Sequence, residues 1–139
     1  MSQGLRRKAR EAVIQALYLS DVAGESLTDS LEQVRDNFAI DKRARNFAAE
    51  IVRGLSPLMA EIDGLISERA ENWRIDRMAV VDRNILRLAV YELRYRPDIP
   101  ATVAINEALE IARRFTSDDA VSFINGILDP LRGELGRND

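Results

Sequence analysis

The longest apolar stretch of the sequence runs from Met78 to Arg96 and predicts a helix at the centre of the fold. At 100° per residue its apolar side chains sweep an arc of roughly 200°, wider than the single stripe of an ordinary surface helix. Such a helix must be covered on more than one side. Asp82 and Glu92 fall within the arc, so each needs a partner or a place at its edge, because an unpaired buried charge is costly.

Apolar residues recur at helical spacing in five further segments, which are 5–23, 26–38, 42–70, 103–115 and 117–135. Pro57 is expected to kink the third of these helices rather than split it, because proline removes the hydrogen bond to the carbonyl of Arg53. Segment 71–77 fits a connection between two helical halves, with Trp73 as a packing plug. Gly126 indicates close approach of another group to its helix, and the tail 133–139 is expected to fray. The pattern predicts an all-α fold.

The composition excludes most catalytic chemistry. The absence of cysteine and histidine removes disulfides, thiolate chemistry, histidine catalysis and the usual zinc sites. Neither lysine, Lys8 or Lys42, has a plausible nucleophilic pairing, and the sequence has no glycine-rich phosphate loop. We therefore expect no enzyme activity, no catalytic or metal site and no cofactor. With neither a run of roughly 20 apolar residues nor a signal-peptide core, we expect a cytoplasmic protein without membrane contact.

The charge distribution is more informative than the net charge of -3. The first ten residues hold four cations and no acid, namely Arg6, Arg7, Lys8 and Arg10. A helix N-terminus prefers anions, so these cations gain nothing from the helix dipole. A polyanionic partner would give them a role. The alternative is a solvated helix start, which is the more frequent situation in proteins at large.

Four phrases carry a family resemblance: RRKAREAVIQALY at 6–18, VDRNILRLAVYEL at 81–93, IPATVAINEALEIARRF at 99–115 and FINGILD at 123–129. In this order and spacing they resemble the NusB family of bacterial transcription antitermination factors. The resemblance covers the chain nearly end to end, except for segment 24–45, which carries no signature. A similar domain precedes certain ribosomal RNA cytosine methyltransferases, but 139 residues leave no room for that enzyme.

The resemblance implies six or seven helices in two packed three-helix bundles, 1–73 with a basic RNA-binding arm and 74–139, forming one compact unit. It implies a factor that binds the boxA element of nascent ribosomal RNA together with ribosomal protein NusE and helps RNA polymerase read through terminators. Tyr18 and Asp82 match positions of the partner-protein surface. The positions that match RNA-binding residues are Arg6, Arg7, Lys8, Arg10, Gln15, Arg87, Phe123 and Asn125.

Some alternatives remain open at this stage. Phe123 stacks on an unpaired base or is a core aromatic, and Arg87 contacts RNA or is a structural partner of Asp82 or Glu92. For Gly126, packing against a neighbouring helix is the simpler explanation, with RNA approach as the alternative. The second hypothesis for the whole chain is a protein interaction or dimerisation module without a direct RNA role. Whether the protein is a monomer or a homodimer is likewise open.

Overall fold

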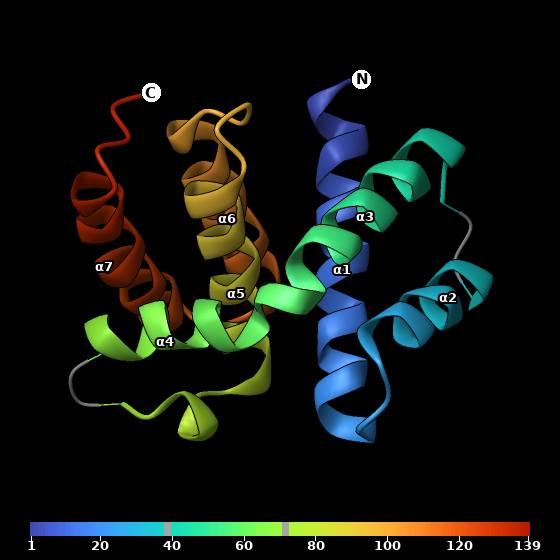
Figure 1. Cartoon of the computed structure of the whole chain (residues 1–139), viewed down its shortest axis with the longest axis horizontal. Coiled ribbons are helices and arrows are strands. Elements are labelled where there is room, and N and C mark those ends of the chain that lie inside the picture. The colour runs from blue at the N-terminus through green and yellow to red at the C-terminus, as the bar shows by residue number, and fades with distance from the viewer. Residues whose placement is uncertain (38–39, 71–72) are drawn as a thin grey trace. The chain divides into compact units, whose positions relative to one another are not determined.

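The computed structural model describes residues 1–37, 40–70 and 73–139, and within these ranges every regular element is helical (Figure 1). The predicted all-α fold is confirmed. The α-helices are α1 (Gln3–Ala23), α2 (Leu27–Asn37), α3 (Lys42–Leu55), α4 (Met59–Arg69), α5 (Val80–Tyr95), α6 (Ala101–Phe115) and α7 (Asp118–Glu134). Two 3-10 turns accompany them, η1 (Ser56–Leu58) and η2 (Ile75–Arg77). None of the described helices is long and apolar enough to span a membrane.

Polar side chains fix where the helices begin. The Ser2 hydroxyl accepts a hydrogen bond from the Leu5 N–H at 3.2 Å and caps α1, and Ser117 caps α7 by accepting from the Ala120 N–H at 3.1 Å. These bonds satisfy backbone donors that have no partner inside the first helical turn. Gly24 ends α1 in the left-handed conformation, with φ of 74°.

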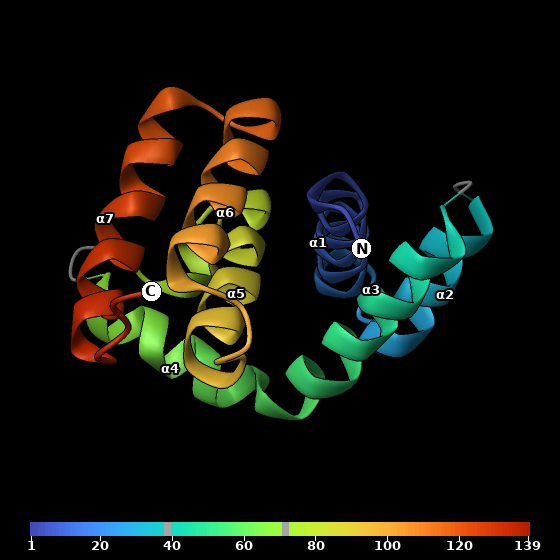
Figure 2. The same cartoon turned by 90° about the horizontal axis from the view of Figure 1, so that it is seen from above.

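The chain forms two compact units, Met1–Leu58 and Met59–Asp139. In the first, α1 packs against both α2 and α3, and α2 packs against α3 (Figure 2). Its core contains fully buried side chains from α1 and α3, including Val13, Leu17, Ile51 and Leu55. The amphipathic faces of α1, α2 and α3 therefore meet in a three-helix bundle. Phe38, the last apolar position expected in the second pattern, lies outside the described residues.

Pro57 separates two helices rather than kinking one. α3 ends at Leu55, η1 follows over Ser56–Leu58, and α4 begins at Met59, so the predicted continuous helix is wrong here. Proline cannot donate to the carbonyl of Arg53, and the tighter 3-10 turn takes over at this point. The division between the two units also lies at Leu58, whereas the sequence pattern indicated residue 73. Within the second unit, α4 packs with α5 and α7.

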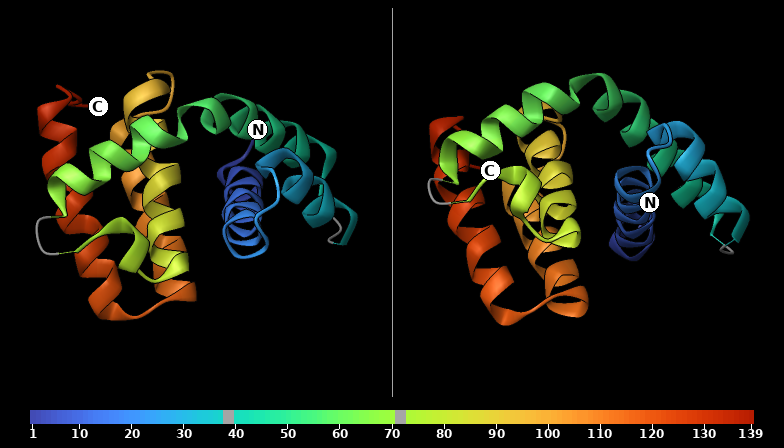
Figure 3. Two further views of the ribbon diagram at one scale, coloured as in Figure 1. Left: turned by 60° about the horizontal axis from the view of Figure 1, so that its bottom comes forward. Right: turned by 90° about the horizontal axis from the view of Figure 1, so that it is seen from below.

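In the second unit, α5 contacts α4, α6 and α7, as the wide apolar arc predicted (Figure 3). Ile85, Leu86 and Leu93 of α5 are almost completely buried. Asp82 lies in its first turn and accepts a hydrogen bond from the Thr116 hydroxyl at 3.0 Å. Glu92 is 1% exposed and has an interaction partner. Both carboxylates of the arc are thus satisfied.

The C-terminal tail is docked, so the prediction that it frays is wrong. Gly136 adopts a φ of 68° after α7 and turns the chain back. The Arg137 guanidinium then donates to the Leu93 carbonyl at 2.6 Å and to the Ile99 carbonyl. Asp139 pairs with Arg137 at 3.1 Å, and this hydrogen bond holds the pKa of Asp139 below its ordinary value. The tail therefore fastens the connection between α5 and α6.

Candidate nucleic-acid interface

The four cations of the α1 arm lie in two different environments. Lys8 is exposed, with its Nζ 3.9 Å from a Glu11 carboxylate oxygen, and Arg7 is partly exposed. The guanidinium groups of Arg6 and Arg10 lie over the Phe47 ring, 5.2 and 5.9 Å from its centroid. Arg10 is only 1% exposed, so its charge is not presented at the surface as the sequence led us to expect. Its neighbour Phe47 on α3 explains this, because the ring offers a favourable site for a buried guanidinium.

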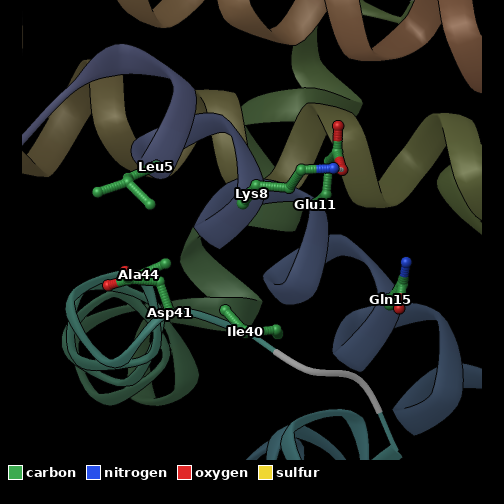
Figure 4. Close-up of a pocket in the computed structure, with 7 residues that line it drawn as sticks. All are labelled: Leu5, Lys8, Glu11, Gln15, Ile40, Asp41 and Ala44. Atoms are coloured by element: carbon green, nitrogen blue, oxygen red, sulfur yellow. Dashed lines mark ion pairs between the residues drawn. The ribbon is translucent and has the colours of Figure 1, made fainter.

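A cleft of about 330 Å³ lies between α1 and the start of α3, and we call it the α1–α3 cleft. Figure 4 shows its lining residues, which are Leu5, Lys8, Glu11, Gln15, Ile40, Asp41 and Ala44. On α1, Lys8, Glu11 and Gln15 follow one another at helical spacing and so share a face. The exposed amide of Gln15 can both donate and accept hydrogen bonds beside the Lys8 charge.

The α3 side of this cleft was missed by sequence reasoning, because segment 24–45 carries no family phrase. The available signal was the capping aspartate at the start of an amphipathic helix. Asp41 accepts from the Arg43 N–H at 2.8 Å, and the Arg43 side chain also bonds to it. The side-chain hydrogen bond from Arg43 is the main cause that lowers the pKa of Asp41. Asp41 is therefore a charged carboxylate at the cleft edge at neutral pH.

The Arg87 side chain forms an ion pair and hydrogen bonds inside the second unit. Its guanidinium grips Asp63 of α4 with two hydrogen bonds of 2.8 and 2.9 Å, and its third nitrogen donates to the Asn84 side chain at 2.9 Å. The Arg87 side chain is 11% exposed. The two structural partners named from the sequence were Asp82 and Glu92, but the ion pair goes to Asp63. The sequence pattern could not predict the Arg87–Asp63 pair, because the two residues lie on different helices, 24 residues apart.

Phe123 is half-buried on α7 and lines a second hollow, of about 390 Å³, that we call the aromatic groove. The residues of this groove are Trp73, Arg77, Met78, Ala79, Asp82, Ser117, Asp119, Ala120 and Phe123. The structure therefore brings Phe123 and Asp82 to one groove, while Asn125 is exposed on α7 and does not line it.

Two sequence expectations near this groove are wrong. Trp73 is 57% exposed, so it is not a packing plug; its ring lies at the groove instead of in the core. Gly126 is exposed on α7, and a Cβ built there would meet nothing within 4 Å, so no helix packs closely against it.

The candidate partner-protein residues lie in different units. Tyr18 on α1 is 45% exposed, and Val22, one turn further along the same helix face, is 62% exposed. Asp82 is half-buried at the aromatic groove of the second unit. In the described parts of the chain, no group of three or more acidic, histidine or cysteine side chains is arranged to hold a metal ion.

Comparison with known proteins identifies the family. The model described as the NusB family matches residues 7–132. The chain belongs to the NusB family. The transcription antitermination protein NusB of Geotalea uraniireducens is 52% identical over 138 residues, covering 94% of this chain and 95% of that protein. NusB of Myxococcus xanthus is 43% identical, covering 96% of this chain and 99% of its own length.

Solved NusB structures share the fold. The structure of T. maritima NusB superposes with a TM-score of 0.86 at 43% identity, covering 93% of this chain and 91% of that one. A chain from a crystal structure of antitermination factors NusB and NusE in complex with double-stranded RNA gives a TM-score of 0.87 at 26% identity, covering 96% of this chain and 99% of its own. The protein is thus a NusB-type transcription antitermination factor and not an enzyme.

Proposed function

We propose that this NusB-family protein binds the boxA element of nascent ribosomal RNA together with ribosomal protein NusE and helps RNA polymerase read through terminators. The single observation that carries the RNA role is the α1 face, where Lys8, Gln15 and the neighbouring Arg7 lie at the surface. A 26% identical NusB chain solved with NusE and RNA supports the choice of partners.

The proposed roles follow from the position of each side chain. Arg7 and Lys8 contact phosphates without selecting a sequence, and Gln15 bonds to a base edge above the α1–α3 cleft. Phe123 stacks on an unpaired base, and the exposed Asn125 amide bonds to another base edge. In this scheme phosphate contacts supply affinity, and the base contacts of Gln15, Phe123 and Asn125 supply selection.

Three arginines of the predicted set receive revised assignments. Arg6 and Arg10 hold the basic end of α1 on Phe47, and Arg6, which is partly exposed, can also face phosphate. Arg87 supports the interface by fixing α5 to α4 through Asp63. We therefore assign direct phosphate contact first to Arg7 and Lys8.

For NusE, the proposed contacts are Tyr18 and Asp82. Tyr18 and Val22 place an exposed ring and an exposed aliphatic side chain on one face of α1, where a partner protein can cover both. Asp82 keeps acceptor capacity beyond its bond to Thr116, because a carboxylate accepts several hydrogen bonds.

The RNA role is tested by fluorescence anisotropy of a labelled single-stranded boxA-type RNA over a salt series. On single-stranded RNA the slope of the logarithm of the binding constant against the logarithm of the salt concentration is roughly -0.7 per phosphate that a cation neutralises. Arg7→Ala with Lys8→Ala is therefore expected to reduce the magnitude of this slope by about 1.4. The matched control replaces two other exposed arginines, Arg53→Ala with Arg113→Ala, and leaves the slope unchanged. An equal slope for the double variant and the wild type contradicts phosphate contact by Arg7 and Lys8. A wild-type protein that binds NusE but no RNA would instead be a protein interaction module without a direct RNA role.

A further inference from the structure

We propose that the aromatic groove takes one unpaired RNA base, with Trp73 as a second stacking residue beside Phe123. The inference rests on the proposed RNA-binding function and gives Trp73 a part in it. Its starting point is that the only tryptophan of the chain is 57% exposed and lines the same groove as Phe123. Every base has an aromatic face, so exposed rings in a groove suit any nucleotide.

The groove has room for such a ligand. Its volume of about 390 Å³ lies at the lower end of the range for small-molecule sites. Ala79 and Ala120 line it with single methyl groups, and Met78, 7% exposed, provides an apolar wall. The two large rings and the small side chains in the lining set leave an apolar surface that is open to solvent.

The polar lining favours a base over an apolar protein side chain. Asp119 lines the groove, and an apolar occupant would remove water from its carboxylate without giving it a partner. Asp82 also lines the groove, but it already accepts a hydrogen bond from the Thr116 hydroxyl. A base instead presents amino and imino N–H donors along its edge, which carboxylates accept. The Ser117 hydroxyl accepts from the Ala120 N–H and can still donate to a base acceptor.

The charge at the groove edge also fits a nucleotide. Arg77 is exposed and lines the groove, so its guanidinium can meet the phosphate that follows a stacked base. Stacking in the groove and phosphate contact at Arg77 then combine an aromatic platform with a cation, the combination that single-strand-binding proteins use. The Asp119 carboxylate favours an occupant that carries hydrogen-bond donors on its edge.

The experiment uses Trp73 as its own probe, since no other tryptophan contributes emission. The full-length protein is titrated with labelled single-stranded boxA-type RNA, and tryptophan emission is recorded beside RNA anisotropy. We expect emission to be quenched in parallel with binding. Trp73→Ala weakens RNA binding about 5- to 150-fold, the range for removing one stacking partner, whereas Trp73→Phe retains most of the affinity. Phe115→Ala, an exposed aromatic outside the groove, is the matched control and binds like the wild type.

Three other results would contradict the proposed role of Trp73 in RNA binding. If anisotropy rises while tryptophan emission stays constant and Trp73→Ala binds normally, the RNA-binding function stands and the role of Trp73 is refuted. If purified NusE alone changes the emission and RNA adds no change, the groove is a protein-binding site and the inference is overturned. If the wild type binds no RNA even with NusE present, the proposed function fails and the inference with it. Circular dichroism of both Trp73 variants shows whether the fold is intact.

Discussion

Arg87 of α5 and Asp63 of α4 form an ion pair with two hydrogen bonds between two helices of the second unit. Both charges are partly withdrawn from water, with side chains 11% and 26% exposed, and the guanidinium is also bonded to Asn84. Two parallel hydrogen bonds fix the geometry of such a pair more strictly than a single contact would. The pair is therefore expected to stabilise the packing of α4 on α5.

Replacement of Arg87 tests this role. Arg87→Ala leaves Asp63 half-buried without its partner, and we expect the free energy of unfolding to fall by about 1 to 3 kcal/mol, less than for a fully buried pair. Chemical denaturation measures the change, and a double-mutant cycle with Asp63→Ala isolates the coupling. Arg113→Ala, which removes an exposed pair with Glu110, serves as the control and costs less than about 1 kcal/mol. Unchanged stability combined with a large drop in RNA affinity would return Arg87 to the set of direct contacts.

For individual residues, the sequence predicts which side chains could take part in binding but not how exposed each side chain is. Arg10 and Lys8 belong to one basic cluster, yet Phe47 of α3 covers only the first. The sequence predicts that Trp73 is a packing plug in the connection between two helical halves, whereas its exposed side chain lines the aromatic groove. Both outcomes depend on which helix approaches from elsewhere in the chain, and local spacing does not contain that information.

Among the elements of the second unit, the tail after α7 binds to the connection between α5 and α6 and holds it in place. Arg137, with a side chain 14% exposed, donates to the carbonyls of Leu93 and Ile99, which lie at the end of α5 and just before α6. Carbonyls at a helix C-terminus have no partner within the helix, so a cation there is favourable.

Arg137→Ala removes these donors. We expect the free energy of unfolding to fall by about 1.5 to 3 kcal/mol, the range for hydrogen bonds to a charged group. Thermal and urea unfolding measure the change. Arg53→Ala, on the exposed side of α3, is the control with little effect. Equal stability of Arg137→Ala and the wild type would mean that the tail adds nothing to the unit.

The same segment gives a pH prediction. The pKa of Asp139 is lowered by its hydrogen bond to Arg137, so its contribution is present above the ordinary value of 3.8 and is lost as the pH falls through the lowered pKa. Asp139→Asn should therefore be less stable than the wild type at pH 7, and the difference should vanish in acid. The comparison requires unfolding curves at both pH values; a difference that persists in acid contradicts the assignment.

Helix positions were largely predictable, because the apolar residues that each helix buries recur with a clear helical period in the sequence. The break at Pro57 was not, since Leu55, Leu58 and Ile62 keep nearly helical spacing through η1. A single 3-10 turn redirects the chain without disturbing the apolar pattern. The docked tail was missed for a different reason: its anchors are backbone carbonyls, which have no signature in the side-chain sequence.

At the scale of the whole molecule, a net charge of -3 coexists with an arm of four cations and no acid in the first ten residues. Sequence alone placed this arm, and the structure divides it into an exposed part and a part held on Phe47. A protein with this charge balance gains limited affinity from its general field and depends on local contacts. We therefore expect modest RNA affinity for the protein alone and a substantial gain when a second protein adds contacts to the same strand.

Joint binding of boxA RNA by this protein and NusE is tested by the dissociation constant for single-stranded boxA-type RNA. It is measured at one fixed salt concentration, with and without saturating NusE. We expect weak binding by the protein alone and binding at least about tenfold tighter with NusE, which corresponds to about 1.4 kcal/mol of coupling. RNA carrying a scrambled boxA sequence should show little of this gain. Equal affinity with and without NusE, or a complex with NusE that binds no RNA, would contradict joint binding of boxA RNA by the two proteins.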